Sequence, residues 1–310
     1  MEIVKKKPTI FLWGSCDLQD IILSSQQIIS NFNFGNSHGY GTTLDFNEIK
    51  KFPPYSPSMM SLYASPGPIA LRLYETMHAN QSKIDCYNHR LYLEICKFSY
   101  LDYLRSVVQP DDVLIVSFST EILTKIQVGK EVFTIPVFST YLANPNNMLH
   151  WLFTEYVAKE HYQVSFDNPA SVTLTHQLTK EFAKTISEIF GERVVCVKTH
   201  VTDVGYSAKR RSFEKLPVSC DSLVPLYKQS RLSMSDHDHA FTSQSLNVVL
   251  KYFCKCYPYD LEIIELTDQY FVDLDRDIGS HPFHLDLFSK IKIGSKIYDR
   301  LIKLTTKEKK

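Results

Sequence analysis

The chain has 310 residues, of which 44% are hydrophobic and 22% charged, the balance of a soluble globular protein with a substantial core. Lysine and arginine together number 34, as do aspartate and glutamate, so the formal net charge of +0 gives no general electrostatic case for a nucleic acid or an anionic membrane as partner. No apolar run approaches the ~18 residues that span a bilayer, and the seven cysteines, odd in number and without a CxxC pair, are typical of reduced thiols in a cytoplasmic protein.

The chain opens with a short apolar run between charged and small residues. TIFLW (9–13) follows three lysines and is followed by Gly14, Ser15 and Cys16. Because the hydrophobic region of a signal peptide needs about 7–15 residues, this run predicts a first β-strand and a cytoplasmic location. The next stretch, 17–29, has apolar residues at helical spacing, which predicts a helix that starts directly after Cys16.

The middle of the chain alternates loop, helical and strand patterns. The stretch 31–60 is rich in Asn, Gly, Ser and Pro and predicts mostly loop. A short strand is expected at SLYAS (61–65), helical structure over 69–107 and a buried strand at VLIVSF (113–118). VFTIPVF (132–138) has a strand-like composition, but Pro136 favours an edge or loop position.

The second half repeats this alternation. We expect helices over 146–161, 174–190 and 242–256, and a last helix from about 285 to 304. Strands are expected at RVVCVKT (193–199) and YDLEIIEL (259–266), and a polar, irregular stretch at 203–240.

Strands that alternate with long helices predict an α/β fold in which helices cover both faces of a parallel sheet. We expect a single domain over residues 1–310, with irregular insertions near 31–60 and 203–240. In such folds, ligands bind beyond the carboxyl ends of the strands. This rule brings together Gly14–Cys16, the segment SFSTE (117–121) and the segment DRDIGSHPFHLD (275–286).

These segments also carry a family resemblance. WGSCDLQD (13–20) resembles the GSC(V)SRD opening of a bacterial family of SGNH-hydrolase-like (GDSL-type) proteins associated with surface-polysaccharide (capsule) biosynthesis. DDVLIVSFSTEIL resembles that family's central strand, RVVCVKTH its later strand, and SHPFHLDLFSKI its closing block of the form PFHYxxxYY. SLYASP matches its serine-bearing strand. The resemblance implies a three-layer, SGNH/flavodoxin-like sheet and acyl-transfer or ester-hydrolysis chemistry.

The resemblance implies roles for individual residues. Laying G-S-C over the G-D-S of GDSL-type enzymes places Cys16 as the nucleophile, with Ser15 as an oxyanion donor or helix cap. A helix N-terminus favours the thiolate of Cys16, although a small buried residue in a turn would fit the tripeptide too. His284 is the candidate base and His281 competes for that role.

Acidic residues near these histidines are open to two interpretations. Asp275 and Asp277 can orient a histidine as a triad carboxylate does, or they can be charges that solvate a loop. The Asp-x-x-His pair usual in SGNH enzymes is absent, because His281 stands three residues before His284.

The oxyanion of an acyl-transfer reaction needs hydrogen-bond donors. Candidates are the backbone N–H groups at Cys16 and near Ser65 or Gly67, together with the side chains of the SFSTE segment, namely Ser117, Ser119 and Thr120. Glu121 can cap the following helix or bind a sugar hydroxyl. Ser117 and Thr120 replace aspartates of the family pattern, whereas Glu121 is kept.

We expect no metal site, because His237 and His239 of SDHDHA (235–240) lack a third ligand at zinc spacing. We also expect no tightly bound cofactor, and acetyl-CoA is the suggested acyl donor. The sequence thus predicts an acyltransferase or esterase that acts on hydroxyls of a carbohydrate or glycan precursor. The alternative is a non-catalytic carbohydrate- or partner-binding module on a degenerate SGNH fold, which the altered SFSTE block favours. The sequence gives no oligomeric state.

Overall fold

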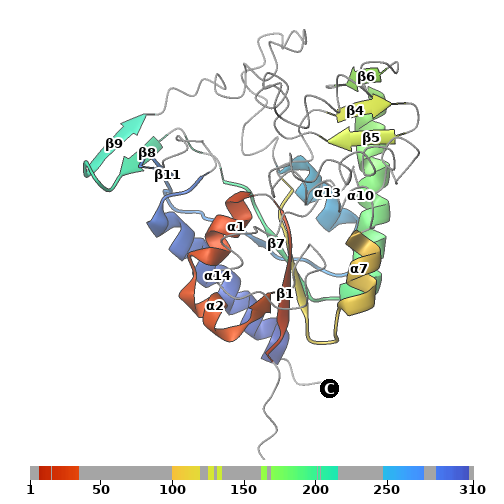
Figure 1. Cartoon of the computed structure of the whole chain (residues 1–310), viewed down its shortest axis with the longest axis horizontal. Helices are drawn as coiled ribbons and strands as arrows, with labels where there is room; N and C mark the ends of the chain where they lie inside the picture. Colours follow the sequence, from red (N-terminus) through yellow and green to blue (C-terminus); the bar gives the residue numbers. More distant parts are fainter. Residues whose placement is uncertain are drawn as a thin grey trace, which may run out of the picture.

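The computed structural model describes residues 7–14, 16–34, 100–118, 125–128, 131–134, 162–165, 169–200, 202, 204–215, 247–275 and 284–306. These residues form an α/β fold, as the sequence predicts, in which helices cover a five-stranded parallel sheet (Figure 1). Among the helices of these ranges, none has both the length and the apolarity to cross a bilayer.

The central sheet consists of β1 (Thr9–Trp13), β2 (Asn33–Phe34), β3 (Val113–Val116), β7 (Val194–Val197) and β10 (Ile263–Ile264). Its spatial order is β10-β7-β3-β1-β2, and every neighbouring pair is parallel. The chain therefore turns from one direction across the sheet to the other between β1 and β3. This reversal is the topological switch point, beside which ligands bind in open α/β sheets.

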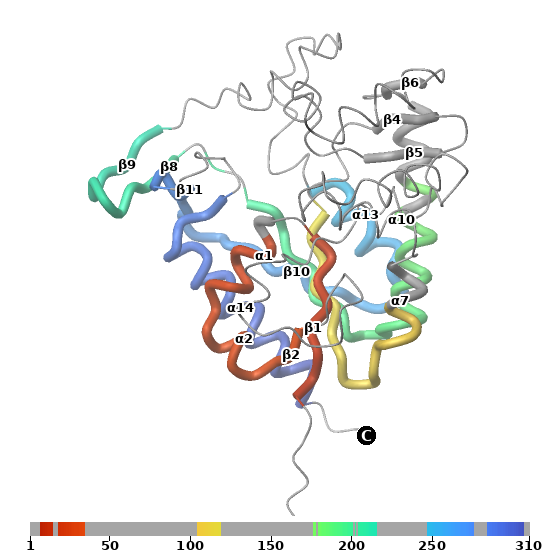
Figure 2. The backbone as a smooth tube through the Cα atoms, in the orientation of Figure 1, coloured from red at the N-terminus to blue at the C-terminus, as the bar shows by residue number. Residues whose placement is uncertain are grey.

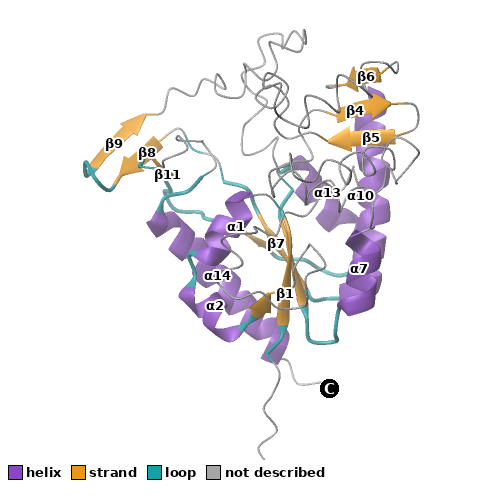
Figure 3. Ribbon diagram, in the orientation of Figure 1, coloured by secondary structure: helices purple, strands orange, loops and turns teal. Residues whose placement is uncertain are grey.

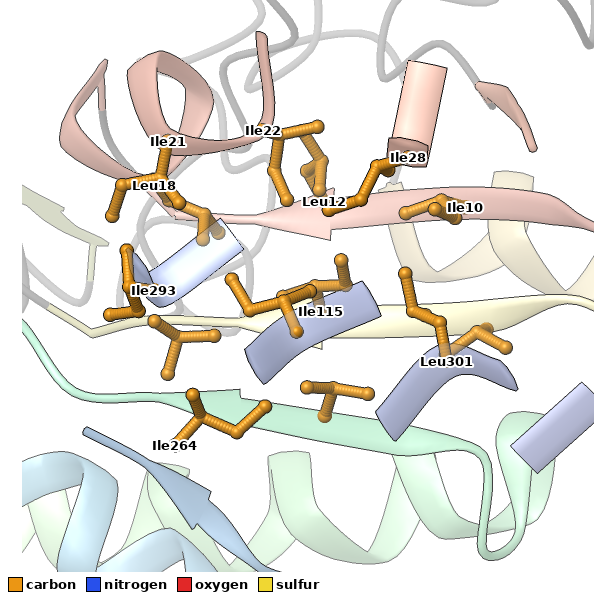
Figure 4. Packing of buried hydrophobic residues seen from close by; sticks show 14 of the residues in the cluster. Ile10, Leu12, Leu18, Ile21, Ile22, Ile28, Ile115, Ile264, Ile293 and Leu301 are labelled. Carbon is orange, nitrogen blue, oxygen red and sulfur yellow. The ribbon is translucent and has the colours of Figure 1, made fainter. Parts of the chain in front are cut away.

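One face of the sheet is covered by α1 (Cys16–Leu23), α2 (Gln26–Asn31) and α14 (Leu287–Thr306). Alternate strand residues such as Ile10, Leu12 and Ile115 point to this face and meet Ile293 and Leu301 of α14 (Figure 4). Side chains alternate between the two faces of a strand, so the intervening residues fill the opposite layer.

The opposite face is covered by α7 (Tyr100–Val107), α10 (Pro169–Phe190) and α13 (Val248–Cys256). Phe11 and Trp13 of β1 enter this layer, where the rings of Trp13 and Phe182 lie 4.4 Å apart between centroids. The continuous apolar runs of the strands are explained by this double burial, because a strand covered on both faces has no side for water.

The prediction of a single helix over 17–29 is wrong, because the chain forms two helices, α1 and α2, with a break at Ser24 and Ser25. The Ser24 hydroxyl and the Ser24 N–H both donate to the Asp20 carbonyl oxygen, and the Ser25 N–H then bonds the Ile22 carbonyl oxygen three residues back, so α1 ends in a tighter turn. The break also admits α14, because a Cβ added at Gly294 would lie 3.1 Å from Ser25 Cβ.

The prediction of irregular structure over 203–240 is wrong for residues 204–215. Residues 204–215 form a β-hairpin of β8 (Val204–Ser207) and β9 (Ser212–Lys215), and β11 (Val272–Asp273) pairs parallel with β8 (Figure 3). Arg211, with a φ of 53°, adopts the left-handed conformation in the connecting turn. The basic residues Lys209, Arg210 and Arg211, which interrupt the strand pattern in the sequence, therefore lie in the turn of the hairpin.

A second small sheet is antiparallel and has the order β5-β4-β6. Its strands are β4 (Lys125–Val128), β5 (Glu131–Thr134) and β6 (Tyr162–Ser165). β5 lies at an edge of this sheet, which is the position that Pro136 predicts from the sequence, because proline cannot donate a backbone hydrogen bond.

The other predicted strands and helices of the described ranges are present with different bounds; α10 begins at Pro169 where 174 was expected, and β10 covers only two residues of the expected strand 259–266. Of the helical stretch predicted over 69–107, only α7 lies within the described residues. The predicted strand at 61–65 and the predicted helix at 146–161 lie outside the described residues.

The amino ends of β1 and β3 are joined by one buried carboxylate. Asp112 accepts hydrogen bonds from the Thr9 backbone N–H at 2.8 Å and from the Gln109 backbone N–H at 2.8 Å. Arg193 donates to the Asp112 carbonyl oxygen at 2.8 Å, which connects the same joint to β7.

We expect Asp112→Ala to lower the free energy of unfolding by about 1–3 kcal/mol, because it leaves the buried Thr9 N–H without its acceptor. Urea unfolding measures the change. The matched control is Asp111→Ala at the neighbouring exposed position, which we expect to change stability by less than about 0.5 kcal/mol. Equal effects of both substitutions would contradict this role of Asp112.

Candidate functional site at the carboxyl edge of the sheet

The site begins where β1 ends. A Cβ added at Gly14 would lie 2.7 Å from Leu18 Cδ2 and 3.3 Å from the Ser117 carbonyl oxygen, so a side chain here would require Leu18 to shift between α1 and the end of β3. The chain passes from Gly14 into α1, whose first residue is Cys16. Cys16 therefore stands at a helix N-terminus, where free N–H groups and the helix dipole favour an anion. Its side chain lies outside the described part of the structure.

His284 is held in place by backbone contacts on both sides. Its carbonyl oxygen accepts a hydrogen bond from the Asp273 N–H at 3.0 Å, which fixes it against β11. Two residues later, Asp286 caps α14 by accepting from the Ser289 N–H at 3.0 Å. The position between the last strand and the last helix is the one expected from the sequence.

The His284 side chain faces α1. Its Nδ1 lies 3.4 Å from Oδ2 of Asp20, and 4% of the side chain is exposed. Figure 2 shows the underlying arrangement, in which α1 and α14 run side by side although they come from opposite ends of the chain. The fold thus brings a histidine from residue 284 to the helix that starts with Cys16.

Asp20 is the residue that sequence reasoning missed. It lies four residues after Cys16, so the two positions share one face of α1. Lys290 Nζ lies 3.8 Å from the same Oδ2 atom, so a cation stands beside the carboxylate that faces the histidine. The sequence did contain a candidate carboxylate here, because Asp20 is the last residue of WGSCDLQD (13–20). The prediction instead chose Asp275 and Asp277, which lie closer to His284 along the chain.

Asp275 has a different, structural role. Its carboxylate accepts hydrogen bonds from the Ser207 hydroxyl at 2.7 Å and from the Lys209 N–H at 2.9 Å, so it fixes the β8–β9 turn. The hydrogen bond from Ser207 lowers the pKa of Asp275. The structure therefore assigns the Asp275 carboxylate to the hairpin turn, and its described hydrogen bonds do not involve His284.

Ser117 lies at the carboxyl end of β3, as expected, but it is buried. Its hydroxyl is 2.9 Å from the Thr199 hydroxyl. Asn247, just before α13, accepts from the Thr199 N–H and donates to the Thr199 carbonyl oxygen, both at 2.9 Å. These three side chains form a polar layer that ties β3, β7 and α13 together. A function of Ser117 as an oxyanion donor stays a prediction.

His200, three residues after β7, joins that strand to the segment after β10. Its Nε2 accepts a hydrogen bond from the Leu266 N–H at 2.7 Å, and Lys198 and Glu265 form an ion pair beside it. Burial, assisted by the Lys198 charge, lowers the pKa of His200 from 6.5 to about 4. His200 is therefore neutral at physiological pH and acts as an acceptor.

The remaining predicted residues lie outside the described residues, so their roles stay predictions: Ser15, Ser65, Gly67, Ser119, Thr120, Glu121, Asp277, His281 and the SDHDHA segment at 235–240. Within the described ranges, no group of three or more His, Cys, Asp or Glu side chains is arranged to hold a metal ion.

Comparisons of the chain with models of protein families, with curated proteins and with solved structures found no match.

The His200 hydrogen bond has a measurable pH dependence. The unfolded chain binds a proton at His200 below about pH 6.5, whereas the folded protein does not until about pH 4, so stability present above pH 6.5 is lost as the pH falls to 4. This group should contribute about 3 kcal/mol to that loss.

We expect His200→Gln, which keeps an acceptor but does not titrate, to flatten the fall of unfolding free energy between pH 6.5 and 4. Urea unfolding at several pH values measures it. His176→Gln, at an exposed position on α10, is the control and should leave the slope unchanged. A slope that stays the same in His200→Gln would show that His200 is not the titrating group.

Proposed function

We propose that this protein is an SGNH-like enzyme that transfers an acyl group to, or removes it from, a sugar hydroxyl. Cys16 is the proposed nucleophile, His284 the base and Asp20 the carboxylate that orients His284. The observation that carries the proposal is the 3.4 Å approach of His284 Nδ1 to Asp20 Oδ2, one helical turn after Cys16.

Three features of the fold support this assignment. The strand order reverses between β1 and β3, and the carboxyl ends of strands at such a point are where α/β proteins place ligands. Cys16 begins the helix that follows β1, at the positive end of its dipole. Asp20 accounts for the missing Asp-x-x-His pair, because a triad is defined by geometry and roles and not by sequence spacing.

The proposed reaction has two steps. The Cys16 thiolate attacks the acyl carbonyl carbon of the donor, a thioester forms, and the departing group takes a proton from His284. His284 then removes the proton from a sugar hydroxyl, whose oxygen attacks the thioester and releases Cys16; water in place of the sugar gives hydrolysis. Because Nδ1 faces Asp20, Nε2 is the nitrogen that exchanges these protons.

The substrate class rests on the sequence resemblance. We propose a carbohydrate or glycan precursor of surface-polysaccharide biosynthesis as acceptor, acetyl-CoA as donor and the cytoplasm as the place of reaction. Transfer is favoured over hydrolysis because the resembling family is biosynthetic. Ser15 and the backbone N–H groups at the start of α1 are the proposed oxyanion donors.

Reactivity of the Cys16 thiol tests the nucleophile and base. We expect iodoacetamide to alkylate Cys16 at neutral pH at least about tenfold faster in the wild type than in His284→Asn, since the imidazole favours the thiolate. Mass spectrometry of timed digests measures the rates. His176→Asn serves as the control and should keep the wild-type rate. Equal rates in all three proteins would remove His284 from the proposed pair.

The role of Asp20 is tested by Asp20→Asn. We expect the rate of acyl release from p-nitrophenyl acetate to fall by about 10²-fold or more, because an amide does not hold the imidazole in the required tautomer. Lys290→Gln removes the cation 3.8 Å from the Asp20 carboxylate and should change the rate by less than about fivefold. Unfolding midpoints show whether each variant is folded. A folded Asp20→Asn variant with the wild-type rate would contradict the orienting role.

A second candidate function is a non-catalytic carbohydrate- or partner-binding module. The burial of His284 and Ser117, which expose 3% and 2% of their surface, favours it because buried polar groups at a sheet edge serve structure as well as catalysis. Slow alkylation of Cys16 together with retained glycan binding would support this second candidate.

A further inference from the structure

Two cysteines, one on a strand of the central sheet and one on a helix that covers it, lie in contact in the layer between the two elements. Cys196 lies on β7 in the layer that faces α13, and Cys254 lies on α13. Their Sγ atoms are 3.6 Å apart and share a hydrogen bond. Neither residue belongs to the site at the carboxyl edge, and neither takes part in the proposed reaction.

The two thiols have unlike surroundings. Cys196 is fully buried, whereas Cys254 is partly exposed at the helix surface. Burial raises the pKa of Cys196, and the hydrogen bond between the two thiols lowers the pKa of Cys254. Thiolate character and access both select Cys254 as the sulfur that reacts with a reagent from solvent.

We propose that Cys196 and Cys254 form a reversible disulfide when a peroxide oxidises Cys254. In the first step the Cys254 thiolate attacks one peroxide oxygen, the O–O bond breaks, and hydrogen peroxide yields the sulfenic acid and hydroxide. In the second step the Cys196 sulfur attacks the Cys254 sulfur, the S–S bond forms, and the hydroxyl group leaves with the Cys196 proton as water. Two equivalents of a thiol reverse the oxidation and become a disulfide themselves.

The geometry makes this step short. The two Sγ atoms are 3.6 Å apart, whereas a disulfide requires about 2.05 Å. The Cys254 side chain therefore has to move toward Cys196 by about 1.5 Å. The bond would connect positions 58 residues apart and fix α13 to the sheet. Cross-links of this kind stabilise a fold by restricting the unfolded chain.

Digestion with trypsin places Cys196, Cys254 and Cys256 on three different peptides. Cleavage after Arg193 and Lys198 releases VVCVK (194–198), and cleavage after Lys251 and Lys255 releases YFCK (252–255). Because Lys255 lies between Cys254 and Cys256, a linked pair VVCVK–YFCK identifies Cys254 without ambiguity.

The experiment treats the full-length, folded protein with hydrogen peroxide, blocks the remaining thiols and maps the digest by mass spectrometry. We expect the linked pair to form and to disappear after dithiothreitol. Sulfinic or sulfonic acid at Cys254 without the linked pair, or linked peptides that join other cysteines instead, would overturn the proposal.

Variants give an independent readout. Peroxide should raise the unfolding midpoint of the wild type by roughly 5 °C, and dithiothreitol should return it to its starting value. Cys256→Ser, on the same helix, is the matched control and should keep this shift, whereas Cys254→Ser should lose it. Should Cys254→Ser fail to fold, Cys196→Ala tests the same loss. A shift that persists in a folded Cys254→Ser or Cys196→Ala variant would also overturn the proposal.

Discussion

The close packing at Gly14 is the constraint on which the arrangement of the site depends. A side chain at this position would run into Leu18 of α1 and the carbonyl oxygen of Ser117 after β3. The Ser117 N–H also donates to the Trp13 carbonyl oxygen at 2.7 Å, so β1 and β3 stay paired to their carboxyl ends. Gly14 thus lies against both α1 and the end of β3, and α1 begins at Cys16, two residues further on.

From this starting point, the position of the candidate base follows through packing. Because α1 begins so close to the strand, its apolar residues Leu18, Ile21 and Ile22 enter the same layer as Ile293 and Ile297 of α14. The two helices then lie beside each other, and the polar positions Asp20, His284 and Lys290 meet at their border. The apolar layer brings the helices together, and this places the Asp20 carboxylate within 3.4 Å of His284 Nδ1.

Much of the fold was predictable because the strands are buried on both faces. TIFLW and VLIV are uninterrupted apolar runs, and such runs identify the centre of a parallel sheet from the sequence alone. The β8–β9 hairpin was not predictable in the same way, since its strand β9 is mostly exposed and its turn is made of basic residues. The break between α1 and α2 was missed because helical spacing continues across Ser24 and Ser25, whereas the turn that ends α1 is set by local hydrogen bonds.

The site was predictable only in part. The position of Cys16 at a helix start and of His284 before the last helix follow from element order, which the sequence carries. The partner of His284 does not, because the contact between Asp20 and His284 joins the first helix to the last across the whole chain. Sequence proximity pointed to Asp275, which the hairpin turn uses instead.

The place of α14 in the fold affects the order in which the protein is made. Leu12 and Ile115 lie in the middle of the sheet, yet α14 covers their layer, and ribosomes synthesise this helix after every described strand. The apolar layer between the sheet and α1, α2 and α14 can therefore be complete only once residues 287–306 have been synthesised. Before that point its apolar residues lack part of their covering partner, and incompletely packed apolar surface is what makes folding intermediates prone to aggregate.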